Sequence, residues 1–379
     1  MTLLDLGVIG TSAKENEHRL PLHPEHLSGL DADLRARITL EHGYGDRFGV
    51  SDTALAEVVS GFASREEILA RSDVVLLPKP QHADVGLLRE GSVLWGWPHC
   101  VQDPGLTQLA IDRRHTVIAF EAMNHWTRDD SVGVHVFHKN NELAGYCSVL
   151  QALQLTGRTG DYGRRLRAAV IGFGATARGA VTALNAHGVH DVVVLTTRGV
   201  AAVGSPIHSV RILQFDHDHG EGHVSEVITE RGRVPAARFL AEFDVVVNCT
   251  FQDTAAPLTY LSTADAASFR PGSLIVDVSC DEGMGFEWAR PTTFDDPMFD
   301  VGRLHYYGVD HSPSYLWESA TWENSLALIP FLRPVLEGPA SWDDDETLAR
   351  AIEIRDGQVV NPAILAFQGR SAEHPHLVV

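Results

Sequence analysis

Short runs of apolar residues recur along the chain between longer and more polar stretches. In the first third they lie at residues 6–9, 72–77, 92–97 and 117–120, and each has the length of a strand. Several are apolar at consecutive positions, which is typical of parallel strands that are buried on both faces. The pattern predicts an α/β fold.

A long helix is expected from residue 137 to about residue 155, and the short apolar runs then begin again. The later runs lie at residues 168–171, 191–197, 243–250, 272–283 and 305–309. A further helix, over residues 320–336, would return to the first part of the chain. We therefore expect two domains, each with a mainly parallel sheet, and a cleft between them.

The domain boundaries follow from these helices. Residues 1–140 and 323–379 would form a discontinuous first domain, and residues 141–322 would form the second domain. The end of the chain, from residue 369, is expected to be a loose tail.

Two glycines follow the first strand of the predicted second domain. Gly172 would allow a tight turn, and Gly174 would let the backbone approach a diphosphate. Ala177 takes the third position, where a small residue lets the next helix pack on the strand. The N–H groups of the first helical turn, at Ala175 and Thr176, would face the phosphates. The turn is typical of a Rossmann domain, and both domains are expected to be Rossmann-like.

The end of the second strand of this domain bears on the choice of dinucleotide. NAD-binding domains usually carry Asp or Glu about 20 residues after the glycines, but this chain has Thr197 and Arg198. An arginine can pair with a 2′-phosphate, so NADP is favoured over NAD, although a solvated arginine is the alternative. Cys249, at the end of a later strand, is expected near the nicotinamide.

Polar residues follow three predicted strands of the first domain. Lys79 lies between two prolines, His99 follows a proline, and Glu121 follows Phe120. Open α/β sheets bind ligands at the carboxyl ends of their strands, so the three residues form a candidate site. Each alone could be ordinary, as a loop lysine or as a core histidine with one hydrogen bond.

Three other residues are candidates for the same site. Arg19 precedes an apolar stretch and could bind a substrate carboxylate, or could pair with a nearby glutamate at the surface. Asp277 and Asp281 both follow an apolar run, and at least one is expected to face the cleft.

Composition narrows the class of partner. The chain has 379 residues, of which 44% are hydrophobic, and a net charge of −20. This negative charge argues against nucleic-acid and anionic-membrane partners. No apolar stretch approaches the roughly 18 residues of a membrane helix, and the first residues lack a basic leader, so a cytoplasmic location is expected. The four cysteines are scattered and indicate neither a disulfide framework nor a zinc site. The role of the histidine-rich segment 208–223 stays open.

Six segments, together with the glycine turn, resemble one enzyme superfamily. It contains alanine dehydrogenase, lysine-forming saccharopine dehydrogenase and N5-(carboxyethyl)ornithine synthase. The segments are residues 14–24, 76–79, 95–102, 276–297 and 309–316, with 41–45 most similar to the carboxyethylornithine enzyme. They occur in the family's order, from residue 5 to about residue 335.

The resemblance implies roles for particular residues. It places Lys79 and His99 at the catalytic positions and Arg19 at the carboxylate-binding position. Glu121 and Asp310 match acids that line saccharopine-type sites, with Asp310 also near the cofactor, and Asp281 matches an alanine dehydrogenase acid. The sequence differs from the saccharopine dehydrogenase pattern at Pro80 and near Glu318. The resemblance therefore does not identify the chemical group at the far end of the substrate.

The function expected from this resemblance is an NADP-dependent reductive condensation. An oxoacid and the amine of an amino acid such as lysine or ornithine would form an imine, which the cofactor reduces, or the reverse would occur. The alternative is reductive amination with ammonia, as in alanine dehydrogenase. A regulatory protein that binds NADP is a further class, disfavoured because Lys79 and His99 are both present. The protein is expected to form a homo-oligomer, but the sequence does not determine the number of subunits.

Overall fold

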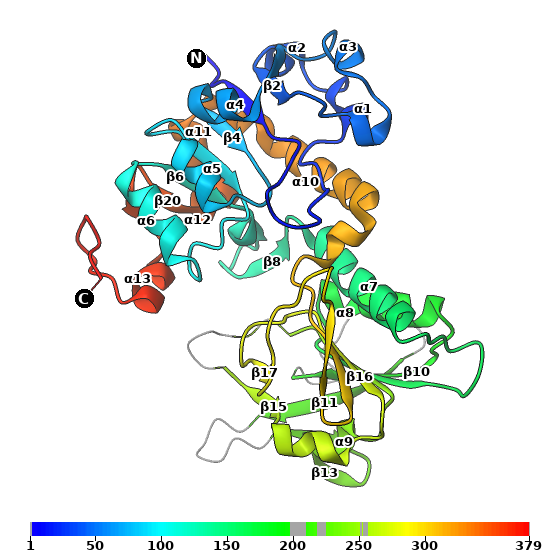
Figure 1. Ribbon diagram of the computed structural model, residues 1–379. Coiled ribbons are helices and arrows are strands. Elements are labelled where there is room, and N and C mark those ends of the chain that lie inside the picture. Colours follow the sequence, from blue (N-terminus) through cyan, green and yellow to red (C-terminus); the bar gives the residue numbers. More distant parts are fainter. Residues whose placement is uncertain (1, 198–209, 218–224, 251, 253–256, 379) are drawn as a thin grey trace. The chain divides into compact units, whose positions relative to one another are not determined.

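The protein folds into two compact units (Figure 1). The computed structural model describes residues 2–197, 210–217, 225–250, 252 and 257–378. Unit 1 consists of Met1–His138 and Trp317–Val379, and unit 2 consists of Lys139–Leu316. Each unit contains a large, mainly parallel sheet, which confirms the predicted two-domain α/β fold.

Unit 1 is built on a sheet that has eight strands among the described residues. In order across the sheet they are β21 (Gln358–Val359), β20 (Ile352–Arg355), β6 (Thr116–Ala119), β5 (Val93–Gly96), β4 (Val74–Leu76), β1 (Leu6–Val8), β2 (Ile38–Glu41) and β3 (Gly61–Ala63). The strands from β6 to β3 pair in parallel, whereas β20 and β21 are antiparallel.

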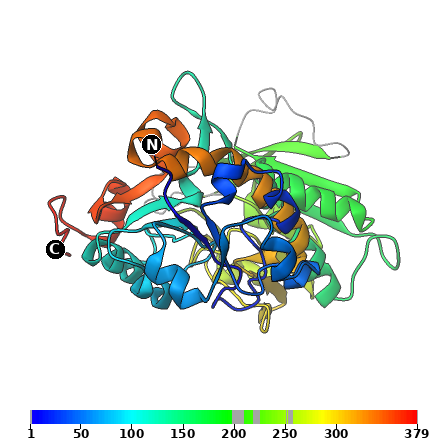
Figure 2. The ribbon, with the colours of Figure 1, turned by 90° about the horizontal axis from the view of Figure 1, so that it is seen from above.

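Alternate residues of the central strands face two different cores, which explains why their sequences are apolar throughout. Val74 and Leu76 belong to one core, and Val75 and Leu77 to the other. Helices cover both faces of the sheet (Figure 2). Those on the first face are α1 (Pro24–Leu27), α2 (Ala32–Arg35), α3 (Asp52–Leu55), α10 (Trp317–Glu337), α11 (Pro339–Asp344) and α12 (Glu346–Ala351). Those on the second face are α4 (Arg65–Arg71), α5 (His82–Leu87), α6 (Pro104–Asp112) and α13 (Pro362–Gln368).

Short elements complete unit 1. They are the 3-10 turns η1 (Asp46–Phe48) and η2 (Phe120–Ala122) and the hairpin of β7 (Asn124–Trp126) and β8 (Val132–His135). The turn η2 follows β6 directly and carries Glu121 at the carboxyl edge of the sheet.

The end of the chain is anchored, so the predicted loose tail is wrong for residues 370–378. Arg370 is buried, and its Nη1 donates to Gln108 Oε1 at 2.7 Å and to the His376 carbonyl at 3.1 Å. His376 in turn accepts the backbone N–H of Val359. The polar sequence concealed this because a guanidinium can be buried when its donors are satisfied.

Unit 2 has a second sheet, with nine strands among the described residues. In order they are β13 (Gly232–Pro235), β12 (Ser225–Thr229), β11 (Arg211–His217), β10 (Asp191–Thr196), β9 (Arg167–Ile171), β14 (Val245–Asn248), β16 (Ser273–Asp277), β19 (Leu304–Tyr307) and β18 (Met298–Val301). The strands from β11 to β19 pair in parallel, and the edges are antiparallel.

Helices also cover both faces of this sheet. One face carries α7 (His138–Leu155) and α8 (Ala175–Ala186), and the other carries α9 (Ala236–Leu240) and the 3-10 turn η4 (Thr263–Ser268). A small pair, β15 (Thr259–Leu261) and β17 (Gly285–Phe286), and the turn η5 (Ser312–Leu316) complete the unit.

Three further features of the sequence can be compared with the structure: membrane helices, cysteines and the histidine-rich segment. None of the helices formed by the described residues is both long enough and apolar enough to cross a membrane. All four cysteines are buried. Half of the histidine-rich segment 208–223, including His208, His219 and His223, lies outside the described residues, as does Arg198.

Two glycines, Gly145 in α7 and Gly179 in α8, let these helices approach closely. A Cβ atom on Gly145 would lie 1.9 Å from the Thr176 carbonyl oxygen. A Cβ atom on Gly179 would lie 1.7 Å from the carbonyl oxygen of Glu142. Because α8 begins at the glycine turn, this contact helps to fix the direction of its N-terminus.

Replacing Gly179 with alanine should destabilise the protein, because the two helices would have to separate. Overpacking of this kind typically costs about 1–3 kcal/mol, so the midpoint of urea unfolding should fall. Gly86→Ala is the matched control, since Gly86 lies in α5 and its Cβ would meet nothing within 4 Å. Equal unfolding midpoints for the Gly179 variant and the wild type would contradict the close packing.

Candidate functional site

Three adjacent strands of unit 1 each lead into a polar residue. The strands β4, β5 and β6 are neighbours in that order, and Lys79, His99 and Glu121 follow their carboxyl ends. Residues that follow adjacent parallel strands lie at the same edge of the sheet. The structure therefore brings these three predicted site residues together.

The centre of this group is a contact between two potential cations. Lys79 Nζ lies 2.8 Å from His99 Nε2. At this distance two positive charges would repel strongly, so the contact favours one proton held between the two nitrogens. The ring of His99 is half exposed, with 48% of its side chain accessible to solvent, so the pair can exchange protons with a ligand.

The carboxyl group of Glu121 holds the backbone of His99. The backbone N–H of His99 donates to Glu121 Oε1 at 2.7 Å, and the same oxygen lies 3.7 Å from ring atom Nδ1. His99 has a φ angle of +51°, a left-handed conformation that a side chain other than glycine adopts at a cost. The hydrogen bond to Glu121 helps to hold this conformation.

Glu121 is itself perturbed. Burial and then the negative charge of Glu353 raise the pKa of Glu121 well above its usual range, although the His99 backbone and the charge of Lys79 act in the opposite direction. The carboxyl group of Glu121 therefore keeps its proton to higher pH than an exposed glutamate does. This favours a role of Glu121 in holding His99 over a role in binding a substrate ammonium, because a neutral acid attracts a cation weakly.

Arg19 is buried rather than exposed at the surface. Its side chain is 2% exposed and forms a bidentate ion pair with Glu17, with a 2.8 Å bond from Nε to Oε1. The Arg19 guanidinium lies 5.2 Å from the ring centre of Trp97, and Lys79 Nζ lies 5.9 Å from the same ring. Trp97 thus places both cations beside one aromatic surface.

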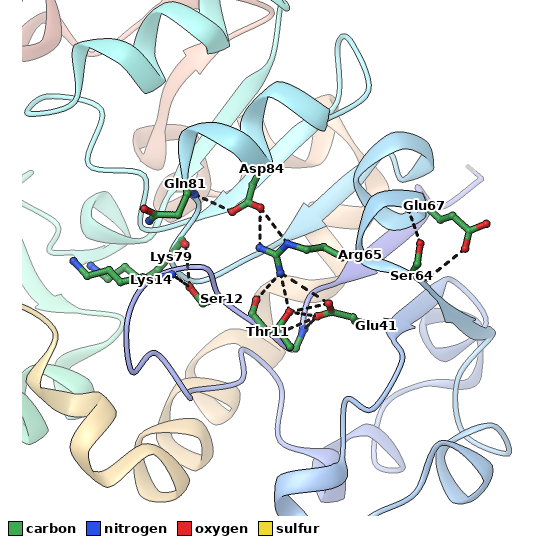
Figure 3. Close-up of polar contacts among 11 residues, drawn as sticks. Thr11, Ser12, Lys14, Glu41, Ser64, Arg65, Glu67, Lys79, Gln81 and Asp84 are labelled. Carbon is green, nitrogen blue, oxygen red and sulfur yellow. Dashed lines mark hydrogen bonds and ion pairs between the residues drawn. The ribbon is translucent and has the colours of Figure 1, made fainter. Parts of the chain in front are cut away.

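A network that the sequence did not reveal fixes the loop after β1 (Figure 3). Glu41 accepts the backbone N–H groups of Gly10 and Thr11, both at 2.8 Å. Arg65 donates to the Thr11 carbonyl at 2.7 Å and to Asp84 at 2.8 Å. No sequence signal joins these residues, because they lie on four separate elements.

The same network reaches the Lys79 loop. Asp84, held by Arg65, accepts the backbone N–H of Gln81 at 2.9 Å. Ser12 donates to the Lys79 carbonyl at 3.4 Å, and Figure 3 shows the Lys14 and Lys79 side chains extending in the same direction. The lysine backbone is therefore held on both sides, which limits the positions of its amino group.

The glycine turn of unit 2 borders a cavity of about 300 Å³. Its lining consists of Ile171, Gly172, Phe173, Gly174, Thr176, Leu195, Thr196, Thr197, Phe215, Cys249 and Thr250. Gly172 has a φ of +111°, and a Cβ there would lie 2.9 Å from the Cys249 carbonyl. At Gly174 a Cβ would meet nothing within 4 Å, so the backbone faces open space at the N-terminus of α8. These features fit a dinucleotide diphosphate.

The predicted acids of unit 2 occupy different environments. Asp277 is fully buried and accepts hydrogen bonds from Asn248, Tyr306 and the Cys280 backbone. Burial raises the pKa of Asp277 to about 7. Its three hydrogen bonds join the ends of β14, β16 and β19, so its role is structural. Asp281 is half-buried, and burial raises its pKa. Asp310 contacts Nδ1 of the buried His311.

The sequence patterns of one enzyme family match most of the chain. The N-terminal domain of alanine dehydrogenase/PNT matches residues 9–144, and the C-terminal domain matches residues 167–362. The chain belongs to the alanine dehydrogenase/PNT family. This confirms the relationship that the sequence motifs predicted.

Relatives of two kinds are similar to the chain. An N(5)-(carboxyethyl)ornithine synthase of Clostridium botulinum is 24% identical, over 81% of this chain and 87% of the relative. An alanine dehydrogenase of Mycobacterium tuberculosis is also 24% identical, over 98% of this chain and 99% of the relative. The equal identities do not choose between the two activities.

Solved structures agree with the fold. An L-alanine dehydrogenase covers 96% of this chain with a TM-score of 0.76 and 20% identity. A transhydrogenase from Sinorhizobium meliloti covers 94% with a TM-score of 0.70 and 20% identity. At this identity the likeness concerns the fold.

Replacing Gly172 with alanine should impair dinucleotide binding. The left-handed backbone and the nearby Cys249 carbonyl both oppose a Cβ atom there, so the turn must shift. We expect the dissociation constant for the cofactor, measured by fluorescence titration, to rise by about tenfold or more, since a cost of about 1.4 kcal/mol already gives tenfold.

Gly163→Ala is the control for this substitution. Gly163 also has a positive φ, of +80°, but a Cβ there would meet nothing within 4 Å and the residue does not line the cavity. It should lose some stability and keep its cofactor affinity. Unchanged affinity in the Gly172 variant would show that the turn does not bind the cofactor.

Proposed function

We propose that the protein is an NADPH-dependent amino-acid dehydrogenase of the opine type. It would condense an oxoacid with the amine of an amino acid such as lysine or ornithine and reduce the resulting imine, or run the reverse reaction. The observation that carries this proposal is the contact of 2.8 Å between Lys79 and His99. The relatives, which include carboxyethylornithine synthases and alanine dehydrogenases, support it.

The residues of unit 1 would perform the proton transfers. His99 would act as general acid–base, since an imidazole exchanges protons near neutral pH. Lys79 would bind a carboxylate or assist loss of water from the carbinolamine. Arg19 would bind a substrate carboxylate beside Trp97, a role that requires it to share its donors with Glu17.

The residues of unit 2 would hold the cofactor and part of the substrate. Gly172, Gly174 and the first turn of α8 would bind the diphosphate of the dinucleotide, which when bound would supply the hydride that reduces the imine. Asp281 and Asp310 are proposed to hold a substrate ammonium. An alanine-dehydrogenase-like reaction with ammonia is the second candidate, favoured by the relatives of that name.

Replacing either member of the Lys79–His99 pair should reduce turnover. Lys79→Met and His99→Gln are each expected to lower kcat by about 10²–10⁴-fold, the range for positioned acid–base groups. Cofactor affinity, measured by titration, should change little, because both residues belong to unit 1.

His82→Gln is the matched control for His99. His82 lies in the same unit, but it is 58% exposed and its Nε2 contacts Asp103. It should retain wild-type turnover. If His99→Gln also retains it, the acid–base role assigned to His99 is wrong.

The cofactor preference should depend on Arg198. Arg198→Ala is expected to weaken NADPH binding by about 1.5–3 kcal/mol, the size of a charge-assisted hydrogen bond, and to affect NADH little. Parallel fluorescence titrations with the two cofactors measure the difference. Equal losses for both would contradict recognition of the 2′-phosphate by this arginine.

A substrate panel decides between condensation and ammonia use. NADPH oxidation would be followed with pyruvate or 2-oxoglutarate, either with ammonia alone or with single amino acids that carry a second amine. Condensation predicts a rate that saturates with one amino acid and a secondary amine as product, identified by mass spectrometry. A rate that saturates with ammonia and gains nothing from any amino acid would overturn the proposal.

A further inference from the structure

The loop that follows His99 leads directly into α6. The His99 carbonyl accepts the backbone N–H groups of Gln102 at 3.1 Å and of Asp103 at 3.0 Å, so the left-handed conformation of His99 begins a tight turn. Asp103 then caps α6, because its side chain accepts the Leu106 N–H at 2.9 Å. The direction of the His99 side chain therefore depends on how this loop is held.

The residue after His99 is held by two donors. Cys100 is fully buried, and its carbonyl accepts hydrogen bonds from Thr107 Oγ1 at 2.8 Å and from Gln368 Nε2 at 2.7 Å. The same amide nitrogen lies 3.3 Å from the Val101 carbonyl oxygen and 3.3 Å from Thr107 Oγ1. Thr107 belongs to α6, which the loop itself enters, whereas Gln368 ends α13 (Figure 1). Gln368 thus joins the loop to a helix that is distant in the sequence.

A buried arginine fixes the direction of this amide group. Arg370 Nε donates to Gln368 Oε1 at 2.6 Å, and a guanidinium offers donors but no acceptor. The oxygen of the amide must therefore face Arg370, so that its NH₂ group faces the carbonyls of the loop. The guanidinium is held in turn, because its Nη1 donates to Gln108 at 2.7 Å and its Nη2 donates to the Pro104 carbonyl at 3.2 Å.

The core of unit 1 keeps α13 next to the loop. Ile364, in the middle of this helix, belongs to the same core cluster as Cys100 and Leu106. Close packing of this kind fixes the distance between the end of the helix and the loop. The match to the family patterns ends at residue 362, so that match assigns no role to Gln368.

We infer that Gln368 is a positioning residue for His99. Its amide group, oriented by Arg370, holds the carbonyls of the two residues that follow His99. Glu121 holds the other side of His99, since it accepts the His99 backbone N–H at 2.7 Å. With the backbone held on both sides, the ring stays 2.8 Å from Lys79 Nζ, the distance at which the two nitrogens share a proton.

The inference deepens the proposed function and rests on it for its catalytic meaning. Gln368 contacts the backbone of the loop, so it would affect the reaction through His99. The left-handed conformation of His99 is one that a residue with a side chain leaves easily unless its surroundings hold it. A small displacement of a reacting group can cost a large factor in rate, so loss of the Gln368 hydrogen bonds would reduce proton transfer.

The inference can be tested without substrate or cofactor. The variant Gln368→Met keeps the length of the side chain and removes the donor. Hydrogen exchange followed by mass spectrometry reports how often the backbone N–H groups of Gln102 and Asp103 leave the His99 carbonyl. We expect exchange in this loop to quicken by about fivefold to tenfold, the factor that corresponds to one hydrogen bond. Strands β4 and β5 should keep their wild-type exchange rates.

Two further variants separate the hydrogen bond from other effects. Gln358→Met is the matched control, because Gln358 lies in β21 of the same C-terminal segment and is exposed. It should leave exchange in the loop unchanged. Gln368→Glu keeps the shape of the side chain and its partner Arg370, but an ionised carboxylate offers only acceptors to the loop carbonyls. It should quicken exchange at least as much as Gln368→Met.

Activity gives a second reading if the proposed function holds. Gln368→Met should lower kcat by about fivefold to tenfold, with little change in KM for the cofactor, and Gln358→Met should leave kcat unchanged. In a His99→Gln background, the Gln368 substitution should have little further effect, because a residue that acts through the imidazole has no role once the imidazole is gone. A general loss of folded protein would instead lower kcat by the same factor in both backgrounds.

Three outcomes would overturn the inference. They are unchanged exchange in the loop of both Gln368 variants, an equal change in Gln358→Met, and an equal loss of kcat with and without His99. Should Gln368→Met fail to fold, Gln368→Glu gives the same readings. A wild type that is inactive in the proposed reaction would refute the function and leave the exchange result unaffected.

Discussion

The contact between Lys79 and His99 is the constraint on which the candidate site depends. Two basic nitrogens at 2.8 Å can hold one proton between them far more easily than two. Two neighbours contact this pair. The Glu121 carboxyl group accepts the His99 backbone N–H, and the Trp97 ring lies beside Lys79. A pair that shares one proton can act toward a ligand as an acid or as a base.

The sheet of unit 1 makes this contact possible. Parallel pairing of β4, β5 and β6 brings their carboxyl ends to one edge, and the two cores on either side leave these strands no freedom to slip. Polar contacts then fix the loops that follow these strands. Arg65 and Asp84 hold the turn after Lys79 by its backbone, so the position of the amino group depends on residues that no substrate would touch.

The two units offer different chemical groups. Unit 2 offers open backbone at Gly174 and the start of a helix, which suit a phosphate. Unit 1 offers acid–base groups and Arg19. Because Arg19 is already paired with Glu17 in the interior, a substrate carboxylate would have to share its guanidinium with that acid.

The sequence by itself determined the α/β class, the positions of most central strands along the chain, the glycine turn and the residues at three strand ends. These features depend on local periodicity and on the rule that parallel strands present their carboxyl ends together. Only the tertiary structure decided that Arg19 pairs with Glu17 in the interior, that Arg65 clamps the Lys79 loop and that the chain's end is anchored by Arg370. It also decided that Glu353 in β20 is buried, because a register shift between distant strands leaves no mark in either sequence.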